Sequence, residues 1–420
     1  MPDKCTAPAG DDLETPRRSV WTVDGFRRML RCRPILLVGL GAALVVLTLL
    51  GLLLLRPRVP NVSSGDAEAN SAWPSAGADH DQRPLETPNE PAYDAARLSD
   101  TAIASSLDWI ARQQLPDGGW RFDGRASSDV AATALALLPY LGASPAQGAE
   151  PHGAAVSRGL WWLANHQRPD GDLRADSASH LGMYAQSIAA AVLCEAFLWT
   201  GHDDWRRPAA RAIDFLVQAQ CPDGGWRCDL PHERAPADRL SNTSVLGWVL
   251  IALHSARTAG LDVPEETLEL AGHYLDSAAH RDGAAYGYEP DGRPSRAMTA
   301  AALLCRLHLG WTTEHPALRE GVRYLLEDQP PRAEDPDITY WYFATQAMHA
   351  LGGSELTQWR RPLRDVLLAT QEQACEAAGS WSPRGPHAIA CGRLYMTALA
   401  ACVLEIERRP APMPRATSRP

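Results

Sequence analysis

The stretch "QQLPDGGWRFDG", residues 113–124, decides how the rest of the chain is interpreted. It returns as "QAQCPDGGWRCDL" at residues 218–230, and in weaker form as "NHQRPDGDLRAD" at residues 165–176. Aspartate suits a turn or a helix cap, and consecutive glycines supply backbone freedom, so the stretch predicts a tight turn. A turn that recurs in this way indicates a repeat architecture.

Each turn follows a segment with three apolar residues at i, i+3 and i+4 and, in most copies, a glutamine at i+7. This spacing predicts an amphipathic helix with one buried face. The pattern begins at six positions, of which the fourth is degenerate and the last, ending at Gln371, is a poorer copy: Leu107, Leu160, Ile213, Ala271, Val322 and Arg364. After each comes a more uniformly apolar segment, such as "SIAAAVLCEAFLWTG", which is typical of a helix buried on all sides.

Six pairs of outer and inner helices can stack as an open solenoid or close into a ring. An open solenoid needs polar caps at both ends, and neither the first nor the last inner segment is more polar than the others. The sequence therefore favours an all-α fold, an α6/α6 toroid of six helical hairpins. In it, Gln114 should bind backbone groups at the end of its own helix and Trp120 should pack back on the hairpin, stapling the two helices of one unit.

Residues 34–55, "PILLVGLGAALVVLTLLGLLLL", carry no charge over a length that spans a bilayer. Arginines gather before this segment, which predicts a cytoplasmic N-terminus and an extracytoplasmic main domain at the inner membrane. We read the segment as a single-pass signal-anchor; the alternative is a cleaved signal peptide. The predicted parts are a basic N-terminal segment (1–33), the membrane helix (34–55), a proline-rich disordered linker (56–96), the toroid (97–408) and a disordered tail (409–420).

The charge balance bears on the partners. The formal net charge is -10, and the predicted domain has no run of lysine or arginine. Nothing would offset the repulsion of phosphates, so we expect no nucleic-acid partner. The expected partners are the membrane, an apolar lipid ligand and an envelope protein.

The repeated turn also carries a family resemblance. It resembles the QW repeats of squalene–hopene and oxidosqualene cyclases, whose α/α toroid is shared by protein prenyltransferase β subunits and complement-like thioester domains. The likeness covers about residues 100–408 and extends to membrane-anchored planctomycete-type proteins without a settled role. The residues that carry it are Gln114, Asp117, Gly118, Gly119, Trp120, Gln220, Asp223, Gly224, Gly225 and Trp226.

The acid motif that the resemblance leads us to expect is degraded. Squalene–hopene cyclases protonate their substrate with Asp-x-Asp-Asp-Thr-Ala at the start of an inner helix. The matching stretch here, "DVAATA", keeps Asp129 but has alanine at both further acid positions, Ala131 and Ala132. Protonating an alkene needs a neutral, polarised carboxylic acid, so we interpret Asp129 as a helix cap.

The residues that could hold a metal do not match the zinc site of the related family. Prenyltransferase β subunits hold zinc with Asp, Cys and His, and the chain has Cys228, Asp229 and His232 in one loop with His180 before an inner segment. These ligand types suit zinc, but the spacing does not match the family. We expect no cofactor.

A third candidate site lies in "AEDPDITYWYFATQ", where Asp335 and Asp337 precede four aromatic residues. Asp337 is a candidate acid, with a helix cap as the alternative. In a closed ring, aromatic side chains of the inner helices would line a central cavity suited to an isoprenoid chain. The residues that we expect to line it are Tyr184, Trp248, Met298, Tyr340, Trp341 and Tyr395.

Three functions are consistent with these observations. The first is a membrane-tethered toroid that binds an isoprenoid-type ligand or a partner segment without cyclase chemistry; the missing acid motif favours it. The second is an active cyclase or prenyltransferase with a non-standard acid or metal, which would depend on Asp337 or Asp129. The third is a non-catalytic envelope scaffold with a filled core, which the many small inner-helix residues would allow. Catalysis is left open.

Overall fold

The fold was analysed in a computed structural model, which describes residues 90–142, 152–175, 177–178, 180–229, 241–327 and 329–408. All of these belong to one compact unit of the chain, Arg83–Pro420. The predicted membrane segment, residues 34–55, lies outside the described residues. Helix α2 begins at Glu90, before residue 97, where the toroid was predicted to start.

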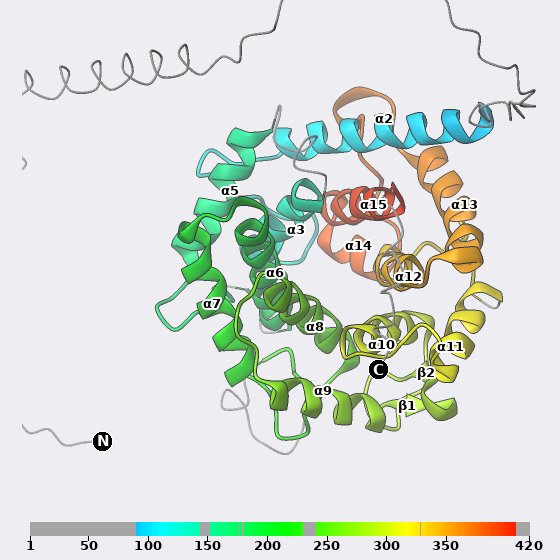
Figure 1. The fold of residues 1–420 in the computed structure, drawn as a ribbon. Helices are drawn as coiled ribbons and strands as arrows, with labels where there is room; N and C mark the ends of the chain where they lie inside the picture. Colours follow the sequence, from blue (N-terminus) through cyan, green and yellow to red (C-terminus); the bar gives the residue numbers. More distant parts are fainter. Residues whose placement is uncertain are drawn as a thin grey trace, which may run out of the picture. The chain divides into compact units, whose positions relative to one another are not determined.

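Two concentric rings of helices make up this unit (Figure 1). The outer ring consists of α2 (Glu90–Arg112), α5 (Gly153–His166), α7 (Asp203–Gln218), α9 (Glu265–Ser277), α11 (Pro316–Glu327) and α13 (Gly353–Thr370). The inner ring consists of α3 (Asp129–Gly142), α6 (Gly182–Thr200), α8 (Thr243–Thr258), α10 (Arg296–His308), α12 (Ile338–Leu351) and α15 (Arg393–Arg408). The helices alternate along the chain between the two rings.

The inner ring is closed. Each inner helix packs on the next, and α15, the last, packs on α3, the first. In the outer ring α13 contacts α2 in the same way. The predicted α6/α6 toroid is therefore confirmed, and the open solenoid is excluded for the described residues.

Short elements fill the connections between the rings. They are β1 (Ala279–His280), β2 (Ala285–Tyr286), the 3-10 helices η1 (Arg281–Gly283) and η2 (Cys375–Ala377), and the short helix α14 (Pro386–Cys391). The two strands are antiparallel, with Ala279 opposite Tyr286.

The repeated turn connects units as well as helices. The Trp120 indole N–H donates to the carbonyl of Ile110 at 2.7 Å, which ties the turn to its own outer helix. The Gln114 amide donates to Gly118 O in the turn and to Ala155 O in the next outer helix, both at 2.8 Å. The prediction of a staple within one unit was therefore too narrow, because Gln114 also joins its unit to the next one.

Later copies of the turn repeat these contacts. Gln220 donates to Thr267 O at 2.9 Å, and Trp226 donates to Leu216 O at 2.8 Å. Gln371 donates to Ala102 O at 2.9 Å, and so closes the outer ring between α13 and α2. This copy was the poorer one in sequence, yet it makes both contacts of the motif. Its tryptophan is Trp381, which follows η2 and donates to Leu367 O.

The turn needs glycine at its third position. Gly224 has a φ of 85°, and an added Cβ there would collide with the carbonyl oxygen of Leu270 in the next outer helix. Gly118 has a φ of 97° at the same place in the first copy. A positive φ and a close backbone approach both exclude larger residues.

One described helix, α6, is long and apolar enough to cross a bilayer by length and composition. Most of it is buried inside the toroid, where it packs on α3, α7 and α8. Its apolar character is therefore accounted for by its place in the inner ring.

Candidate functional site

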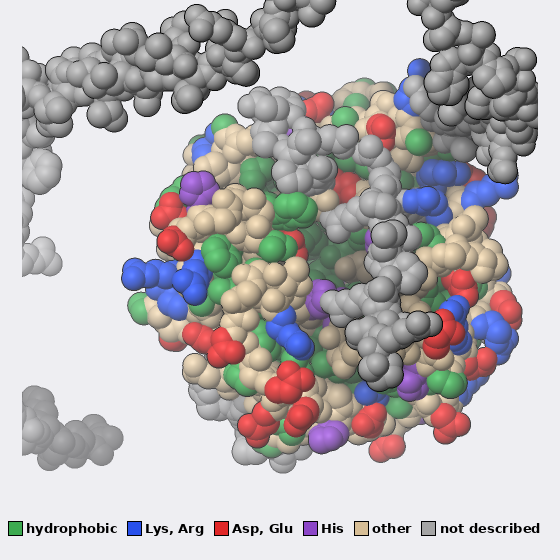
Figure 2. Space-filling model, viewed as in Figure 1, with side chains coloured by type: hydrophobic (Ala, Val, Ile, Leu, Met, Phe, Trp, Pro, Cys, Tyr) green, Lys and Arg blue, Asp and Glu red, His purple; other side chains and the backbone are tan. Residues whose placement is uncertain are grey.

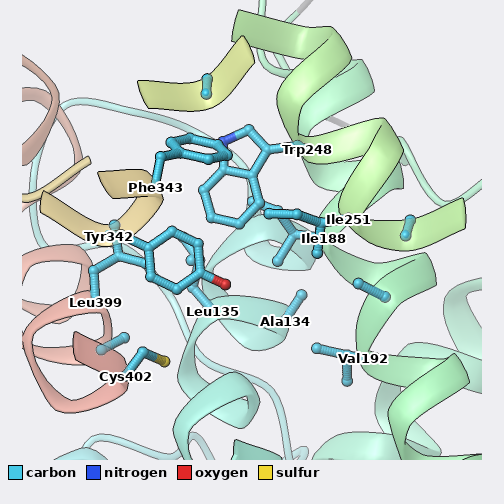
Figure 3. Packing of buried hydrophobic residues seen from close by; sticks show 14 of the residues in the cluster. Ala134, Leu135, Ile188, Val192, Trp248, Ile251, Tyr342, Phe343, Leu399 and Cys402 are labelled. Atoms are coloured by element: carbon cyan, nitrogen blue, oxygen red, sulfur yellow. The ribbon is translucent and has the colours of Figure 1, made fainter. Parts of the chain in front are cut away.

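The middle of the inner ring is filled by three aromatic side chains (Figure 3). Trp248 of α8 stacks on Tyr342 of α12, with ring centroids 5.2 Å apart, and meets the edge of Phe343 at the same distance. All three are less than 5% exposed. Small and branched residues, including Ala134 and Ile188, surround them in the same view. The toroid is therefore not an open channel at this level.

A cavity of about 350 Å³ lies beyond this aromatic layer, towards the ends of the inner helices. All six inner helices contribute to it, mostly from their second halves. Its lining includes Leu138, Leu141, Ala191, Glu195, Leu198, Trp199, Ile251, His254, Ser255, His308, Tyr342, Gln346, Cys402, Glu405 and Ile406. Figure 2 shows a hollow at the centre of the ring with hydrophobic side chains at its floor.

Polar side chains from several inner helices also contribute to this lining. Glu195 accepts a hydrogen bond from Ser255 Oγ at 2.7 Å. The imidazoles of His254 and His308 stack with centroids 4.0 Å apart and planes 6° from parallel. Glu405 of α15 is 5% exposed and lies in the same lining. The cavity thus combines an apolar body with carboxylate and imidazole groups.

The two histidines are held in their neutral form. Burial, with a further contribution from neighbouring His254, lowers the pKa of His308 to about 3. Burial and then Arg257 lower the pKa of His254. The imidazoles of the lining therefore add no positive charge near neutral pH.

Two buried nitrogen atoms in this lining have no hydrogen-bond partner among the described residues. They are Nδ1 of His308 and Nε2 of Gln346. Buried polar atoms normally find a partner, and an unsatisfied one costs about 1–3 kcal/mol. Both atoms are almost fully covered by neighbouring protein atoms, so neither faces the open cavity.

The structure separates the six side chains predicted to line a cavity. Tyr184, Met298 and Tyr395 lie near the starts of inner helices, at the opposite end from the cavity, and Trp248 lies in the aromatic layer between. Tyr184 donates to Ser244 Oγ at 2.9 Å. The hydroxyl oxygens of Tyr395 and Thr339 are 2.7 Å apart.

Tyr340 and Trp341 do not face the centre. The Tyr340 hydroxyl donates to Gln329 O at 2.7 Å, and its ring meets Trp359 of the outer helix α13. Trp341 lies with Val366 and Met396 at a smaller cavity between α12, α13 and α15. Helical rotation instead points the following pair, Tyr342 and Phe343, inwards.

The candidate acids occupy helix starts. Asp337 is the N-cap of α12, and its carboxylate accepts the Tyr340 N–H at 3.1 Å, as the helix-cap alternative predicted. Asp129 does not act as the cap of α3. That cap is Ser128, whose Oγ accepts the Ala131 N–H at 3.1 Å, whereas Asp129 pairs with the Arg121 guanidinium at 2.7 Å.

The candidate zinc ligands do not form a site in the described part of the chain. No group of three or more His, Cys, Asp or Glu side chains there is placed to hold a metal. Cys228 lies 3.8 Å from the amide nitrogen of Asn242, and His180 is exposed at the surface. His232 lies outside the described residues.

Sequence reasoning missed most of the cavity. Glu195, Gln346 and Glu405 stand inside apolar inner segments, as in "AVLCEAFLW" and "ACVLEIE". A polar residue in a segment buried on all sides was the available signal, because such a residue needs a polar contact. The stacking of His254 on His308 could not be read from positions in separate segments.

Comparisons with known proteins agree with the toroid. A drimenyl diphosphate synthase of Streptomyces showdoensis is 28% identical over 198 residues, covering 46% of this chain and 33% of the synthase. A squalene–hopene cyclase of Bradyrhizobium diazoefficiens is 25% identical over 251 residues, covering 53% and 36%. The chain thus spans about a third of the length of these relatives. No protein-family model matches it.

Solved structures extend the likeness over the toroid. The type II terpene cyclase MstE from Scytonema, in complex with geranylgeranyl dihydroxybenzoate, aligns over 75% of this chain and 98% of its own, with a TM-score of 0.51 and 14% identity. An α-1,6-mannanase of Salegentibacter sp. HEL1_6 aligns over the same shares, with a TM-score of 0.54 and 11% identity. Such identities establish the fold alone.

Fold and site together therefore define a helical α/α toroid with a central cavity. Within that class, the weak sequence similarity to squalene–hopene cyclases and the structural match to a type II terpene cyclase make this chain a squalene-cyclase-like toroid.

Proposed function

We propose that the toroid binds an isoprenoid-type apolar ligand in its central cavity and performs no cyclase chemistry. The observation that carries this proposal is the cavity of about 350 Å³ enclosed by all six inner helices. Its volume falls in the range of small-molecule sites, and most of its lining is aliphatic or aromatic.

The cavity mouth supports entry of an apolar chain. Leu198 and Trp199 at the end of α6 both line the cavity and remain 38% and 45% exposed. Exposed large apolar side chains at an opening are typical of a ligand-binding or interaction surface. The Scytonema cyclase, which has the same fold, holds geranylgeranyl dihydroxybenzoate, and this favours an isoprenoid chain over other apolar groups.

The absence of cyclase chemistry is inferred from the acid position. Asp129 accepts three hydrogen bonds from the Arg121 guanidinium, and alanines occupy the two further acid positions. Asp129 therefore lacks the neighbouring acids that would polarise it as a proton donor, and its oxygens are engaged by Arg121. It also lies at the start of α3, away from the cavity near the ends of the inner helices.

The membrane would supply such a ligand. Residues 34–55 are predicted to anchor the chain, which would hold the toroid beside a source of apolar lipid. A membrane-anchored binding protein on the extracytoplasmic side is therefore the cellular setting that we propose.

The test is lipid retention by the full chain. We expect gentle purification and native mass spectrometry to reveal a bound polyprenyl-type lipid at a stoichiometric ratio. Ile251→Trp, which fills the cavity from α8, should reduce the lipid-bound fraction by about tenfold, whereas Ile251→Leu should retain it.

Thermal unfolding of both variants separates loss of binding from loss of fold. If the wild-type chain is purified without lipid and takes up none when it is supplied, the binding proposal is wrong. The filled-core scaffold would then be the better description.

A further inference from the structure

The outer helix α5 carries a tryptophan that the repeat does not require. In the six outer helices, the residue after the first position of the apolar pattern is, in chain order, Asp108, Trp161, Asp214, Gly272, Arg323 and Asp365. The other five copies therefore build the same helix with a charged residue or glycine at this place. Trp161 is 46% exposed, and tryptophan is among the residues that contribute most at binding sites. Its presence in one copy alone indicates a binding surface.

Trp161 lines an open hollow of about 340 Å³ between α5 and the first repeated turn. Its ring lies against Trp205 of α7, with centroids 4.9 Å apart, which limits the orientations of the exposed ring. Trp162 and His166, whose rings stack 3.6 Å apart, also line this hollow. A second hollow of about 280 Å³, which extends to Asp129 at the start of α3, shares these two residues. The two hollows therefore adjoin, and we call them together the α5 groove.

Polar groups of both kinds flank the aromatic rings. Asp117 Oδ1 accepts the Gly119 N–H at 3.0 Å, and a carboxylate can accept further hydrogen bonds. The Arg158 guanidinium donates one N–H to Gln114 and has others to donate. Asn165 is exposed in the same hollow, and its amide offers both donors and an acceptor. The groove therefore suits a ligand that donates and accepts hydrogen bonds at closely spaced points.

The formal charges of the acidic and basic side chains in the groove balance. Among the described lining residues, each hollow has one carboxylate and one guanidinium, Asp117 with Arg158 in the first and Asp129 with Arg121 in the second. A strongly charged ligand of either sign therefore meets a repelling group together with an attracting one. A neutral polar ligand meets no such repulsion.

We infer that the α5 groove binds a neutral oligosaccharide. A sugar ring has an apolar face of C–H groups, which can pack on a tryptophan ring, and its edge carries hydroxyl groups that both donate and accept. Trp161 supplies the ring, and Asp117, Arg158 and Asn165 supply the polar partners. The site is built on outer helix α5, apart from the cavity of the inner helices, so it does not depend on the ligand proposed for that cavity.

A proline-rich peptide is the main competitor for an exposed tryptophan, because such peptides dock in aromatic-lined grooves. Proline has no backbone N–H, however, and a proline stretch presents only acceptors. It would leave the Asp117 carboxylate without a donor. The hydroxyl groups of a sugar satisfy both Asp117 and Arg158, and this favours the oligosaccharide.

The experiment titrates three uncharged tetrasaccharides, chitotetraose, cellotetraose and maltotetraose, into the full chain in lipid nanodiscs. Calorimetry follows binding, empty nanodiscs serve as the blank, and hexaproline is titrated in parallel. We expect at least one tetrasaccharide to bind with a dissociation constant of about 1 mM or lower, and hexaproline to bind at least about tenfold more weakly.

Matched variants locate the binding. Trp161→Asp introduces the residue that α2, α7 and α13 have at the same position, so the fold should be kept, which melting followed by circular dichroism checks. It should raise the dissociation constant of the tetrasaccharide at least about tenfold. Asn165→Ala, at an exposed position of α5, should raise it about threefold. Asp365→Ala, at the matching position of α13, is the control and should leave it unchanged.

The inference is wrong if no tetrasaccharide binds, or if folded Trp161→Asp and Asn165→Ala bind it as tightly as the wild-type chain. Binding of hexaproline that depends on Trp161, without binding of any tetrasaccharide, would make the groove a peptide-binding surface instead. Lipid retention in the central cavity is measured separately and involves other residues, so failure of this inference and failure of the proposed function can be told apart.

Discussion

At the scale of single residues, the positions that resemble an enzyme have structural partners. Asp337 caps α12, and Asp129 pairs with Arg121. Arg296, the first residue of α10, pairs with Asp335 at 2.6 Å. The side chains that line the cavity come from later positions in the inner helices. The candidate acids therefore lie at the starts of inner helices, whereas the cavity lies towards the other ends of these helices.

A substitution at Asp337 distinguishes a cap from a catalytic acid. We expect Asp337→Ala to lower the free energy of unfolding by about 1 kcal/mol, because the Tyr340 N–H loses its acceptor. Asp337→Asn, which keeps a capping oxygen, should change it by only a few tenths of a kcal/mol. Urea unfolding of the three proteins measures both effects. A product-forming activity that disappears in the asparagine variant would instead support the enzyme alternative.

At the scale of elements, the repeated turn accounts for the assembly of the rings. Its tryptophan ties a turn to its own outer helix, and its glutamine reaches the backbone of the next outer helix. Gln371 does this across the join between the last and first outer helices. Ring closure therefore uses the same glutamine contact that joins the first three outer helices to their successors.

Removal of the closing glutamine should weaken the join. Gln371 is 8% exposed and donates to Ala102 O and Gly379 O, both at 2.9 Å. We expect Gln371→Ala to lower the free energy of unfolding by about 1–3 kcal/mol, since two buried carbonyls lose their donor. Gln113→Ala, at an exposed position of the first turn, is the control and should have little effect. Equal stability of the two variants would show that packing alone closes the ring.

At the scale of the whole molecule, closure places all six inner helices around one cavity, in whose lining His254 of α8 stacks on His308 of α10. The two imidazoles are kept neutral by burial inside this ring. The unfolded chain has no such restraint. The stability of the toroid is therefore linked to pH through residues of the cavity.

The sign of this pH dependence follows from His308. Its pKa is about 3 in the folded chain and about 6.5 when unfolded, so below pH 6.5 only the unfolded chain takes up this proton. The contribution is present above pH 6.5, and we expect stability to fall by up to about 1.4 kcal/mol per unit as the pH decreases below it. Urea unfolding between pH 7 and pH 5 measures the slope. His308→Phe, which keeps a stacking ring, should flatten it; an unchanged slope would assign the dependence to other groups.

The sequence by itself determined the helical repeat, the alternation of half-buried outer and fully buried inner helices, and the choice of a closed ring. These features depend on the local spacing of apolar residues and on glycines in the repeated turn. Both signals lie within short stretches of sequence, so they can be recognised without the tertiary structure. The capping role of Asp337 has the same local origin.

Only the tertiary structure decided which inner-helix side chains meet. Two positions along α12 separate Tyr340, which faces α13, from Tyr342, which lines the cavity. The last copy of the turn, at Gln371, has its tryptophan contact only because the chain passes through η2 before Trp381. The Trp381 indole N–H then donates to Leu367 O. The placement of Glu195, His308 and Glu405 in the lining of one cavity depends on ring closure, because helices distant in sequence become neighbours only when α15 packs on α3.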